Sequence, residues 1–252
     1  THRDAVLGDL GEIGAEPIES APNAVRLPPD SDVLSTEAYQ EGRVEIQDLG
    51  SQLICQASGA KPGMTVLDLC AGAGGKTLAL AALMENRGRL IAADTDRRRL
   101  NQLPDRAERA AVSIAETLLL DPGKEAEALA GLAGKCDLVL VDAPCSGTGT
   151  WRRNPETRWR LTPKRLDAVV TLQTRLLDLA ATMVKPGGRL AYAVCSLLDQ
   201  EGDYQALRFL ADHPGWTAVH EAGAGRRHGN GTLLDPSHDG SDGFYYALFA
   251  PT

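Results

Sequence analysis

The continuous apolar run CDLVLVDAP, residues 136–144, constrains the fold of this chain more than any other feature. Its apolar residues do not alternate with polar ones, so both faces of the strand that it forms must be covered, as in the centre of a parallel sheet. TVLDLC (65–70), RLIAADT (89–95) and GRLAYAVCS (188–196) predict similar strands. Because helical patterns separate these runs, the sequence predicts a doubly wound α/β fold with helices on both faces of a mostly parallel sheet.

The other expected elements are less clearly marked. Helices are predicted around 47–58, 76–84, 97–111 and 163–184, and strands near 112–120, 216–221 and 244–250. Gly187 and Gly188 should stop the helix before the 188–196 strand. Residues 1–40 show no sustained period and are expected to form an irregular arm with a short strand around 24–27.

Composition excludes several classes of protein. The five cysteines are odd in number and lack a C-x-x-C pair, which disfavours a disulfide framework or a zinc site and favours a reducing cytoplasm. No 18-residue apolar run or leader-like start is present, so neither a membrane span nor an intact secretory signal is expected. Since the chain begins with Thr, we expect a trimmed or processed piece.

Residues that carry chemistry gather at the ends of the predicted strands. Ligands of doubly wound sheets bind at the carboxyl ends of the strands. Those ends hold four carboxylates and three cysteines: Asp68, Cys70, Asp94, Asp121, Asp142, Cys145 and Cys195. A single Asp at such a place is typical of turns and helix caps, but the whole set favours a functional site. Cys55 and Cys136 are interpreted as small buried hydrophobic residues.

The glycine loop CAGAGGKT, residues 70–77, nearly fits two nucleotide-binding templates. A phosphate-binding P-loop needs glycine where Cys70 stands, and the dinucleotide fingerprint needs its third glycine where Thr77 stands. Glycines before a helix nevertheless let a ligand approach free backbone N–H groups. Asp94 follows Gly72 by 22 residues, where a carboxylate can bind both hydroxyls of a ribose. The pattern predicts a nucleoside-containing ligand and leaves NAD, ATP and S-adenosylmethionine open.

Four segments carry a family resemblance: DLCAGAGGKT, AADTDRRRL, VDAPCSGTGTWRRNPE and YAVCSLLDQEGD. Their order and spacing resemble the RsmB/Nop/Sun-type RNA cytosine-5 methyltransferases over about residues 24–250. The resemblance implies a class I methyltransferase (Rossmann-like) fold with a seven-stranded sheet and S-adenosylmethionine as cofactor. It also implies a catalytic domain at 46–252, preceded by an N-terminal arm or partial RNA-binding extension at 1–45. Ala73 and Val194 stand where the family more often has Pro and Thr, but neither carries a reacting atom.

The same resemblance implies roles for individual residues. Cofactor contacts would come from Cys70, Ala71, Gly72, Gly74, Lys76, Asp94, Arg99, Asp121 and Asp142. Cys195 would be the nucleophile, Cys145 would assist release, and Asp142 would face the target cytosine.

The expected reaction explains why two cysteines are present. C5 of cytosine becomes nucleophilic only after a thiolate adds to C6, which is covalent catalysis. Asp142 would then meet N3, a role in which a carboxylate must be protonated or share a proton. The C5 proton must leave before the nucleophile is expelled, with Cys145 or a nearby water as base. DNA cytosine-5 methyltransferases use the Pro-Cys cysteine instead, so Cys145 as the attacking residue is the rival interpretation.

The expected RNA-binding segment lies just after Cys145. Residues 151–165 hold six basic side chains against one acid, a bias that favours contacts with phosphates. The basic residues are Arg152, Arg153, Arg158, Arg160, Lys164 and Arg165. Trp151 or Trp159 could stack on a base, and the cytosine must be unpaired or flipped out to react. The net charge of −8 would confine RNA to this rim.

The sequence thus predicts a monomeric, metal-free, cytoplasmic RNA methyltransferase that modifies 16S ribosomal RNA, with tRNA as the alternative substrate. An RNA-binding assembly factor that retains the fold without catalysis is a second hypothesis. A P-loop NTPase, based on GGKT at 74–77, is a third.

Overall fold

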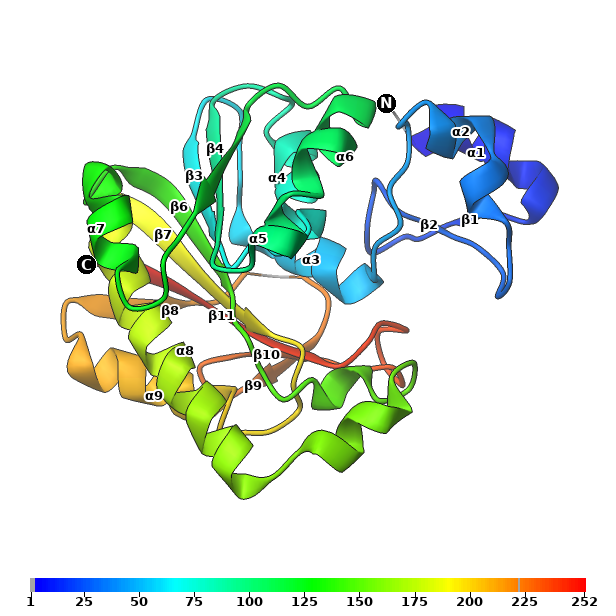
Figure 1. The fold of residues 1–252 in the computed structure, drawn as a ribbon. Coiled ribbons are helices and arrows are strands. Elements are labelled where there is room, and N and C mark those ends of the chain that lie inside the picture. The colour runs from blue at the N-terminus through cyan, green and yellow to red at the C-terminus, as the bar shows by residue number, and fades with distance from the viewer. Residues whose placement is uncertain (1–2, 222) are drawn as a thin grey trace.

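The structure, a computed structural model, describes residues 3–221 and 223–252. Within them one mixed sheet of nine strands runs in the order β5-β4-β3-β6-β7-β11-β10-β9, and β8 also pairs with β11 (Figure 1). The first five strands of this order are parallel to one another, and β11 is antiparallel to β7. The predicted doubly wound, mostly parallel sheet with helices on both faces is confirmed.

The bounds of the strands follow the predicted runs closely. The parallel strands are β3 (Thr65–Leu69), β4 (Arg89–Asp94), β5 (Ala115–Leu119), β6 (Cys136–Asp142) and β7 (Val184–Val194). The antiparallel part holds β8 (Trp216–Val219), β9 (Arg226–His228), β10 (Gly231–Leu234) and β11 (Phe244–Pro251).

The expected number of seven strands is wrong, because residues 226–234, where no strand was predicted, form the hairpin β9–β10. His228 pairs with Gly231, so only Gly229 and Asn230 connect the two strands. Gly229 has φ +56°, the backbone geometry that two-residue hairpin turns require. The Gly-Asn pair was the sequence signal for this hairpin.

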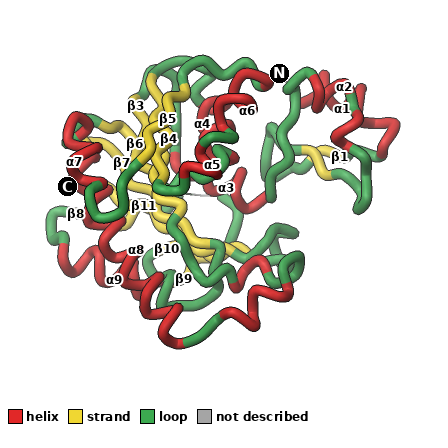
Figure 2. The backbone as a smooth tube through the Cα atoms, viewed as in Figure 1, coloured by secondary structure: helices red, strands yellow, loops and turns green. Residues whose placement is uncertain are grey.

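Helices cover both faces of the sheet (Figures 1 and 2). They are α3 (Leu49–Ser58), α4 (Gly75–Leu83), α5 (Arg97–Leu100), α6 (Leu103–Arg109), α7 (Glu125–Leu129), α8 (Pro163–Met183) and α9 (Asp203–Asp212). One core lies between the sheet and α7, α8 and α9, and another lies between the sheet and α3 and α4. Along β6, Val139 and Val141 belong to the first core while Leu138 and Leu140 belong to the second. A fully apolar strand is needed because both of its faces are buried.

Two local expectations need correction. The helix predicted over 97–111 is divided into α5 and α6, and Pro104 stands in the first turn of α6, where a missing N–H costs nothing. Gly187 and Gly188 do not stop a helix: α8 already ends at Met183, and both glycines lie inside β7. The register between β6 and β7 shifts there, and glycine inside a strand is typical of such a bulge.

The N-terminal segment is more ordered than expected. It contains α1 (Arg3–Leu10), α2 (Glu37–Gln40) and a two-stranded ribbon of β1 (Glu16–Pro17) and β2 (Val25–Arg26). Val6, Leu10 and Ala38 form its small core. The Arg109 guanidinium lies 4.0 Å from the centre of the Tyr39 ring and joins this unit to α6. No helix within the described residues is both long enough and apolar enough to cross a membrane.

The loops that follow β6 and β7 meet the start of β11 at one glycine. Gly149 lies in the 3-10 turn Thr148–Thr150 and donates its N–H to the Cys195 carbonyl at 3.1 Å, while Gly243 donates to the Gly149 carbonyl at 2.9 Å. A Cβ atom at position 149 would lie 1.9 Å from the Gly243 oxygen. The backbones are therefore too close for any side chain here.

We expect Gly149→Ala to lower the free energy of unfolding by about 1–3 kcal/mol, the usual cost of overpacking. Gly131→Ala is the matched control, because a Cβ there has no atom within 4 Å. Urea denaturation, with the slope m compared between variants, measures both. Equal midpoints for the two variants would contradict the close packing of these loops.

Candidate active site

Two cysteines from neighbouring strands meet at the carboxyl edge of the sheet. Cys145 follows β6 and Cys195 follows β7, and their Sγ atoms lie 3.2 Å apart. They are 50 residues apart in sequence, but β6 and β7 pair in parallel with Asp142 opposite Ala193. Parallel neighbours end at the same edge, so the sheet itself brings the two sulfurs together.

An ion pair lies beside the sulfurs. Lys76 Nζ donates to Asp142 Oδ2 at 2.8 Å and to Ser51 Oγ at 3.1 Å, and it lies 5.4 Å from the centre of the Phe244 ring. Burial alone would lower the pKa of the Lys76 ammonium, but the charge and hydrogen bond of Asp142 keep this pKa above its usual value. The pair therefore holds its proton on Lys76 at neutral pH.

The two thiols are not equivalent. The hydrogen bond with Cys195, followed by burial, raises the pKa of Cys145 well above its usual value. The same hydrogen bond lowers the pKa of Cys195; burial and Asp142 oppose that shift, and Lys76 supports it. Cys195 is therefore the more acidic of the two thiols. Because the thiolate is the nucleophile, this geometry favours Cys195 over Cys145 as the attacking sulfur.

The predicted cofactor residues surround the loop between β3 and α4. Asp94 Oδ2 accepts the Gly72 N–H at 2.7 Å, and Asp94 Oδ1 accepts the Asp96 N–H at 2.7 Å. The N–H groups of Cys70 and Ala71 both donate to the Ala93 carbonyl. Gly72 has φ +58°, and a Cβ there would meet the Arg99 guanidinium at 2.4 Å. The loop and Asp94 therefore form one structural unit.

The remaining cofactor candidates differ in their surroundings. Gly74 caps α4 with φ +83°. Asp121 is exposed and follows β5, next to Asp94 because Leu120 N–H donates to the Asp94 carbonyl at 2.9 Å. Lys76 points to Asp142 and Ser51. Sequence reasoning gave no role to Ser51 or Phe244, which the fold brings to Lys76.

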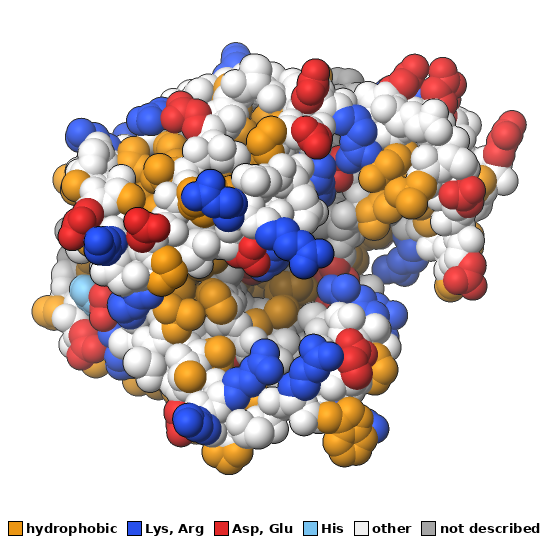
Figure 3. Space-filling model, viewed as in Figure 1, with side chains coloured by type: hydrophobic (Ala, Val, Ile, Leu, Met, Phe, Trp, Pro, Cys, Tyr) orange, Lys and Arg blue, Asp and Glu red, His pale blue; other side chains and the backbone are white. Residues whose placement is uncertain are grey.

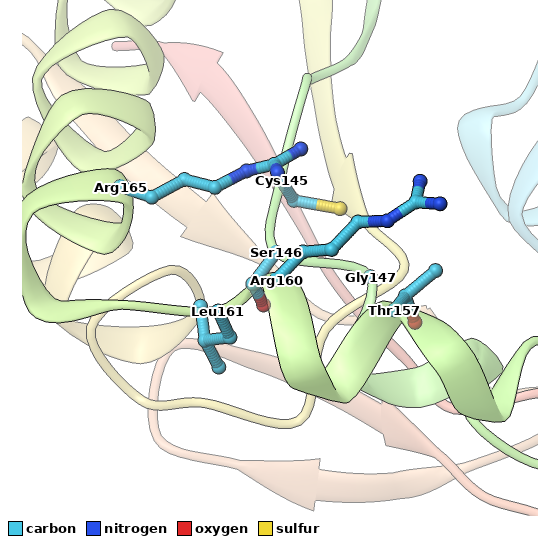
Figure 4. A pocket seen from close by; sticks show the side chains of 7 residues that line it. All are labelled: Cys145, Ser146, Gly147, Thr157, Arg160, Leu161 and Arg165. Carbon is cyan, nitrogen blue, oxygen red and sulfur yellow. The ribbon is translucent and has the colours of Figure 1, made fainter.

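A cavity of about 200 Å³ opens directly beside Cys145. Its lining includes Ser146, Gly147 and Thr157, with Arg160 and Arg165 on the side of α8. Figure 4 shows both arginine side chains extending toward the Cys145 sulfur. The two guanidinium groups come from the end of the 3-10 segment Pro155–Arg160 and from the first turn of α8.

In the space-filling view several Lys and Arg side chains surround a hollow (Figure 3). The other predicted RNA-binding residues differ in their surroundings. Arg152 and Arg153 are paired with the buried carboxylate of Asp242, so part of their charge is neutralised. Arg158 lies 4.5 Å from the centre of the Trp159 ring, which is 77% exposed. Lys164 is exposed. Trp151 is half-buried, and its indole nitrogen has no partner among the described residues.

Within the described residues, no group of three or more His, Cys, Asp or Glu side chains could hold a metal ion. The groups available for chemistry at this edge are two thiols and a lysine–aspartate ion pair, next to a glycine loop of the kind that binds nucleoside-containing ligands. A mostly parallel Rossmann-like sheet with this edge defines a class I methyltransferase.

Comparisons with known proteins identify the family. The model of the family described as 16S rRNA methyltransferase RsmB/F matches residues 57–250, and the chain belongs to this family. The resemblance drawn from the four motifs is thereby confirmed.

Among curated relatives, "Probable ribosomal RNA small subunit methyltransferase B" of Synechocystis sp. is 33% identical over 98% of this chain and 57% of its own length. "Ribosomal RNA small subunit methyltransferase B" of Salmonella paratyphi B is 33% identical over 97% of this chain and 56% of its own length. The chain spans little more than half the length of these relatives.

Solved structures agree in fold. "Crystal Structure of PH0851" has a TM-score of 0.91 and 34% identity, covering 99% of this chain and 57% of that one. "The crystal structure of NSun6 from Pyrococcus horikoshii with SFG" has a TM-score of 0.78 and 25% identity, covering 90% of this chain and 57% of that one.

A buried acid stands beneath the cofactor loop and generates a pH prediction. Asp68 is fully buried in β3, and Thr77 Oγ1 donates to its Oδ2 at 2.6 Å. Burial, partly offset by this hydrogen bond, raises the pKa of Asp68 to about 7. The unfolded chain loses this proton near pH 4, whereas the folded chain keeps it up to about pH 7.

Stability is therefore lost as pH rises from about 4 to about 7. We expect Asp68→Asn to reduce this loss by at least about 1 kcal/mol, measured as the unfolding free energy at a series of pH values. Asp105→Asn, at an exposed position, should leave the pH profile as in the wild type. Identical profiles for wild type and Asp68→Asn would contradict the assignment.

Proposed function

We propose that this chain carries the catalytic domain of an RNA methyltransferase that transfers a methyl group to C5 of a cytosine in 16S ribosomal RNA. The observation that carries the proposal is the Cys145–Cys195 pair at 3.2 Å, next to the Lys76–Asp142 ion pair. The names of the curated relatives support ribosomal RNA, with tRNA as the alternative. A monomer in a reducing cytoplasm, where the two sulfurs stay reduced and do not form a disulfide, fits this role.

S-adenosylmethionine is the cofactor, and it supplies an electrophilic methyl group when bound. The residues fit it. Asp94 uses one acceptor position on each oxygen for the loop backbone, which leaves the other positions for the two hydroxyls of a ribose. Gly72 lacks the side chain that would fill the space before Arg99. We assign Cys70, Ala71, Gly72, Gly74, Asp94, Arg99 and Asp121 to this ligand.

Lys76 is assigned to Asp142 instead. Because its ammonium is held by the Asp142 carboxylate, the pair can pass a proton toward N3 of the cytosine as charge develops there. Asp142 borders both the base and the methyl donor in this arrangement.

The remaining steps fall to the sulfurs. The Cys195 thiolate forms a bond to C6, the C5–C6 double-bond electrons move toward N3, and N3 takes a proton from the Lys76–Asp142 pair. Once C5 carries its methyl group, Cys145 or a water beside it removes the C5 proton. Those electrons form the C5–C6 double bond, the bond from C6 to the Cys195 sulfur breaks with its electron pair leaving on the sulfur, and N3 returns its proton to the Lys76–Asp142 pair. An assembly factor without catalysis would have no use for two thiols in contact, one of which has a lowered pKa.

We expect Cys195→Ala to reduce methyl transfer at least about 10³-fold, as loss of a covalent nucleophile does. Cys145→Ala should bind RNA and form the C6 adduct, but release it slowly. A denaturing gel of enzyme incubated with labelled RNA and S-adenosylmethionine should show a covalent band for this variant only. Cys136→Ala, a buried thiol of β6 away from the site, is the control. Full turnover by Cys195→Ala would end the proposed mechanism.

The RNA path is inferred from arginines without acidic partners. Most described arginines form ion pairs: Arg3, Arg43, Arg87, Arg89, Arg106, Arg109, Arg152, Arg153, Arg175, Arg189, Arg208 and Arg226. Arg158, Arg160 and Arg165 have no acidic partner within ion-pair distance among the described residues. Since Arg160 and Arg165 line the cavity beside Cys145, we propose that they bind a phosphate next to the flipped cytosine. Trp159 offers an exposed ring for stacking.

Arg160→Gln and Arg165→Gln should each weaken binding of single-stranded RNA and lower the slope of log K against log salt by about 0.7. The turnover at saturating RNA should stay within about twofold, because phosphate contacts position the RNA rather than react. Arg87→Gln, at the opposite edge of the sheet before β4, is the matched control. An unchanged salt slope in both cavity variants would exclude this RNA path.

A further inference from the structure

A buried carboxylate lies behind the two sulfurs and has no part in the chemistry described so far. Glu201 is fully buried, between β7 and α9. Among the described residues, no Lys, Arg or His lies within ion-pair distance of it. A buried charge without a cation is costly unless hydrogen bonds satisfy it, so its surroundings need an explanation.

Four donors surround the carboxylate. Oε1 accepts the Ser146 N–H at 2.7 Å and Gln173 Nε2 at 3.0 Å. Oε2 accepts the hydroxyl of Ser196 at 2.6 Å and the hydroxyl of Ser146. An ionised carboxylate has about four acceptor positions, and all of them are filled. The site is therefore built for the charged form.

These donors belong to the two cysteine loops. Ser146 directly follows Cys145, and Ser196 directly follows Cys195. Gln173 of α8 also donates to the Pro144 carbonyl at 2.9 Å. The backbone of Glu201 is held in turn, because the Tyr192 hydroxyl donates to its carbonyl at 2.6 Å. One side chain thus joins β7, α8 and both loops that carry sulfur.

The charge acts unequally on the sulfurs. After the hydrogen bond to Cys195 and burial, the Glu201 carboxylate further raises the pKa of Cys145. On the other side of the pair, Lys76 lowers the pKa of Cys195 and Asp142 raises it. Lys76 and Asp142 thus oppose one another at Cys195, whereas the negative charge of Glu201 adds to the causes that make Cys145 the weaker acid of the two thiols.

We propose that Glu201 is a positioning residue that fixes the Cys145–Cys195 geometry and keeps the ionised sulfur at Cys195. This role deepens the proposed methyl transfer and rests on it for the kinetic measurement only. A residue that merely stabilised the fold would change the melting temperature without changing which sulfur reacts.

Two variants separate the charge from the hydrogen bonds. In Glu201→Gln, the amide oxygen can still accept from the Ser146 N–H and Gln173, and the amide nitrogen can donate to the two serine hydroxyls. The hydrogen bonds to both cysteine loops are kept, and the negative charge of the side chain is lost. Glu201→Ala loses both. Asp235→Asn is the control, because Asp235 is a buried carboxylate held by Ser237, His238 and Arg226, with no bond to either cysteine loop.

The first measurement needs neither RNA nor cofactor. The folded protein is treated with iodoacetamide over a range of pH, and mass spectrometry of peptides gives the ratio of alkylation at Cys195 to that at Cys145. The sulfur displaces iodide, so the ratio reports which sulfur is ionised. We expect Glu201→Gln to lower this ratio at least fivefold, while Asp235→Asn keeps the wild-type ratio.

The second measurement is methyl transfer. We expect kcat to fall about tenfold in Glu201→Gln and about 100-fold in Glu201→Ala, as misplaced reacting groups do, with the KM for RNA within twofold. If Glu201→Ala does not fold, Ser196→Ala, which removes one hydroxyl of the set, replaces it with an expected loss of about tenfold.

Two results together would overturn the inference. Glu201→Gln would show the wild-type alkylation ratio and the wild-type kcat, and Glu201→Ala or its replacement Ser196→Ala would also show the wild-type kcat. Failure of the proposed function has a different signature. In that case the wild-type protein methylates no cytosine in RNA, while the alkylation ratio still decides whether Glu201 controls the sulfur pair.

Discussion

The parallel pairing of β6 with β7 is the interaction on which the site depends. Val141 lies opposite Tyr192 and Asp142 opposite Ala193, and the Ala143 N–H continues the ladder to the Ala193 carbonyl at 2.9 Å. A slip of one residue would turn every side chain to the other face and carry the sulfurs out of contact. The buried apolar residues on both sides of β6 fix this register, so the packing that stabilises the sheet also places the two sulfurs next to each other.

Charged groups lie on both sides of the sulfur pair. The Lys76–Asp142 ion pair is near Cys195, and Glu201 lies behind Cys145. In a poorly solvated place such fixed charges act more strongly than in water, and they need no reorganisation when the substrate arrives. A single thiol with the usual pKa near 8.5 is mostly protonated at neutral pH. The hydrogen bond with Cys145 lowers the pKa of Cys195, and no histidine or metal ligand set among the described residues takes part.

Much of the sheet and the strand-end residues of the site could be predicted from the sequence. The features that could not be predicted share one physical cause. The apolar run of β6, the position of Asp94 at the end of β4 and the strand-end cysteines are local signals whose meaning does not depend on distant residues. By contrast, Arg153 pairs with Asp242, 89 residues away, and Lys76 with Asp142, 66 residues away. Side-chain partners at such separations are set by packing. The bulge at Gly187–Gly188 likewise depends on the close approach of the Cys136 carbonyl.

The net negative charge of the chain affects where a polyanion can bind. A net charge of −8 repels a polyanion from most of the surface, and ion pairs neutralise most arginines. Arg160 and Arg165, which line the cavity beside Cys145, have no acidic partner within ion-pair distance among the described residues. The same holds for Arg26, Arg97, Arg98, Arg99 and Arg227, so the cavity is not the only place with unpaired positive charge. The cavity differs from those places in that its two guanidinium groups lie beside a thiol, and on an acidic surface a polyanion bound to them is held next to that thiol.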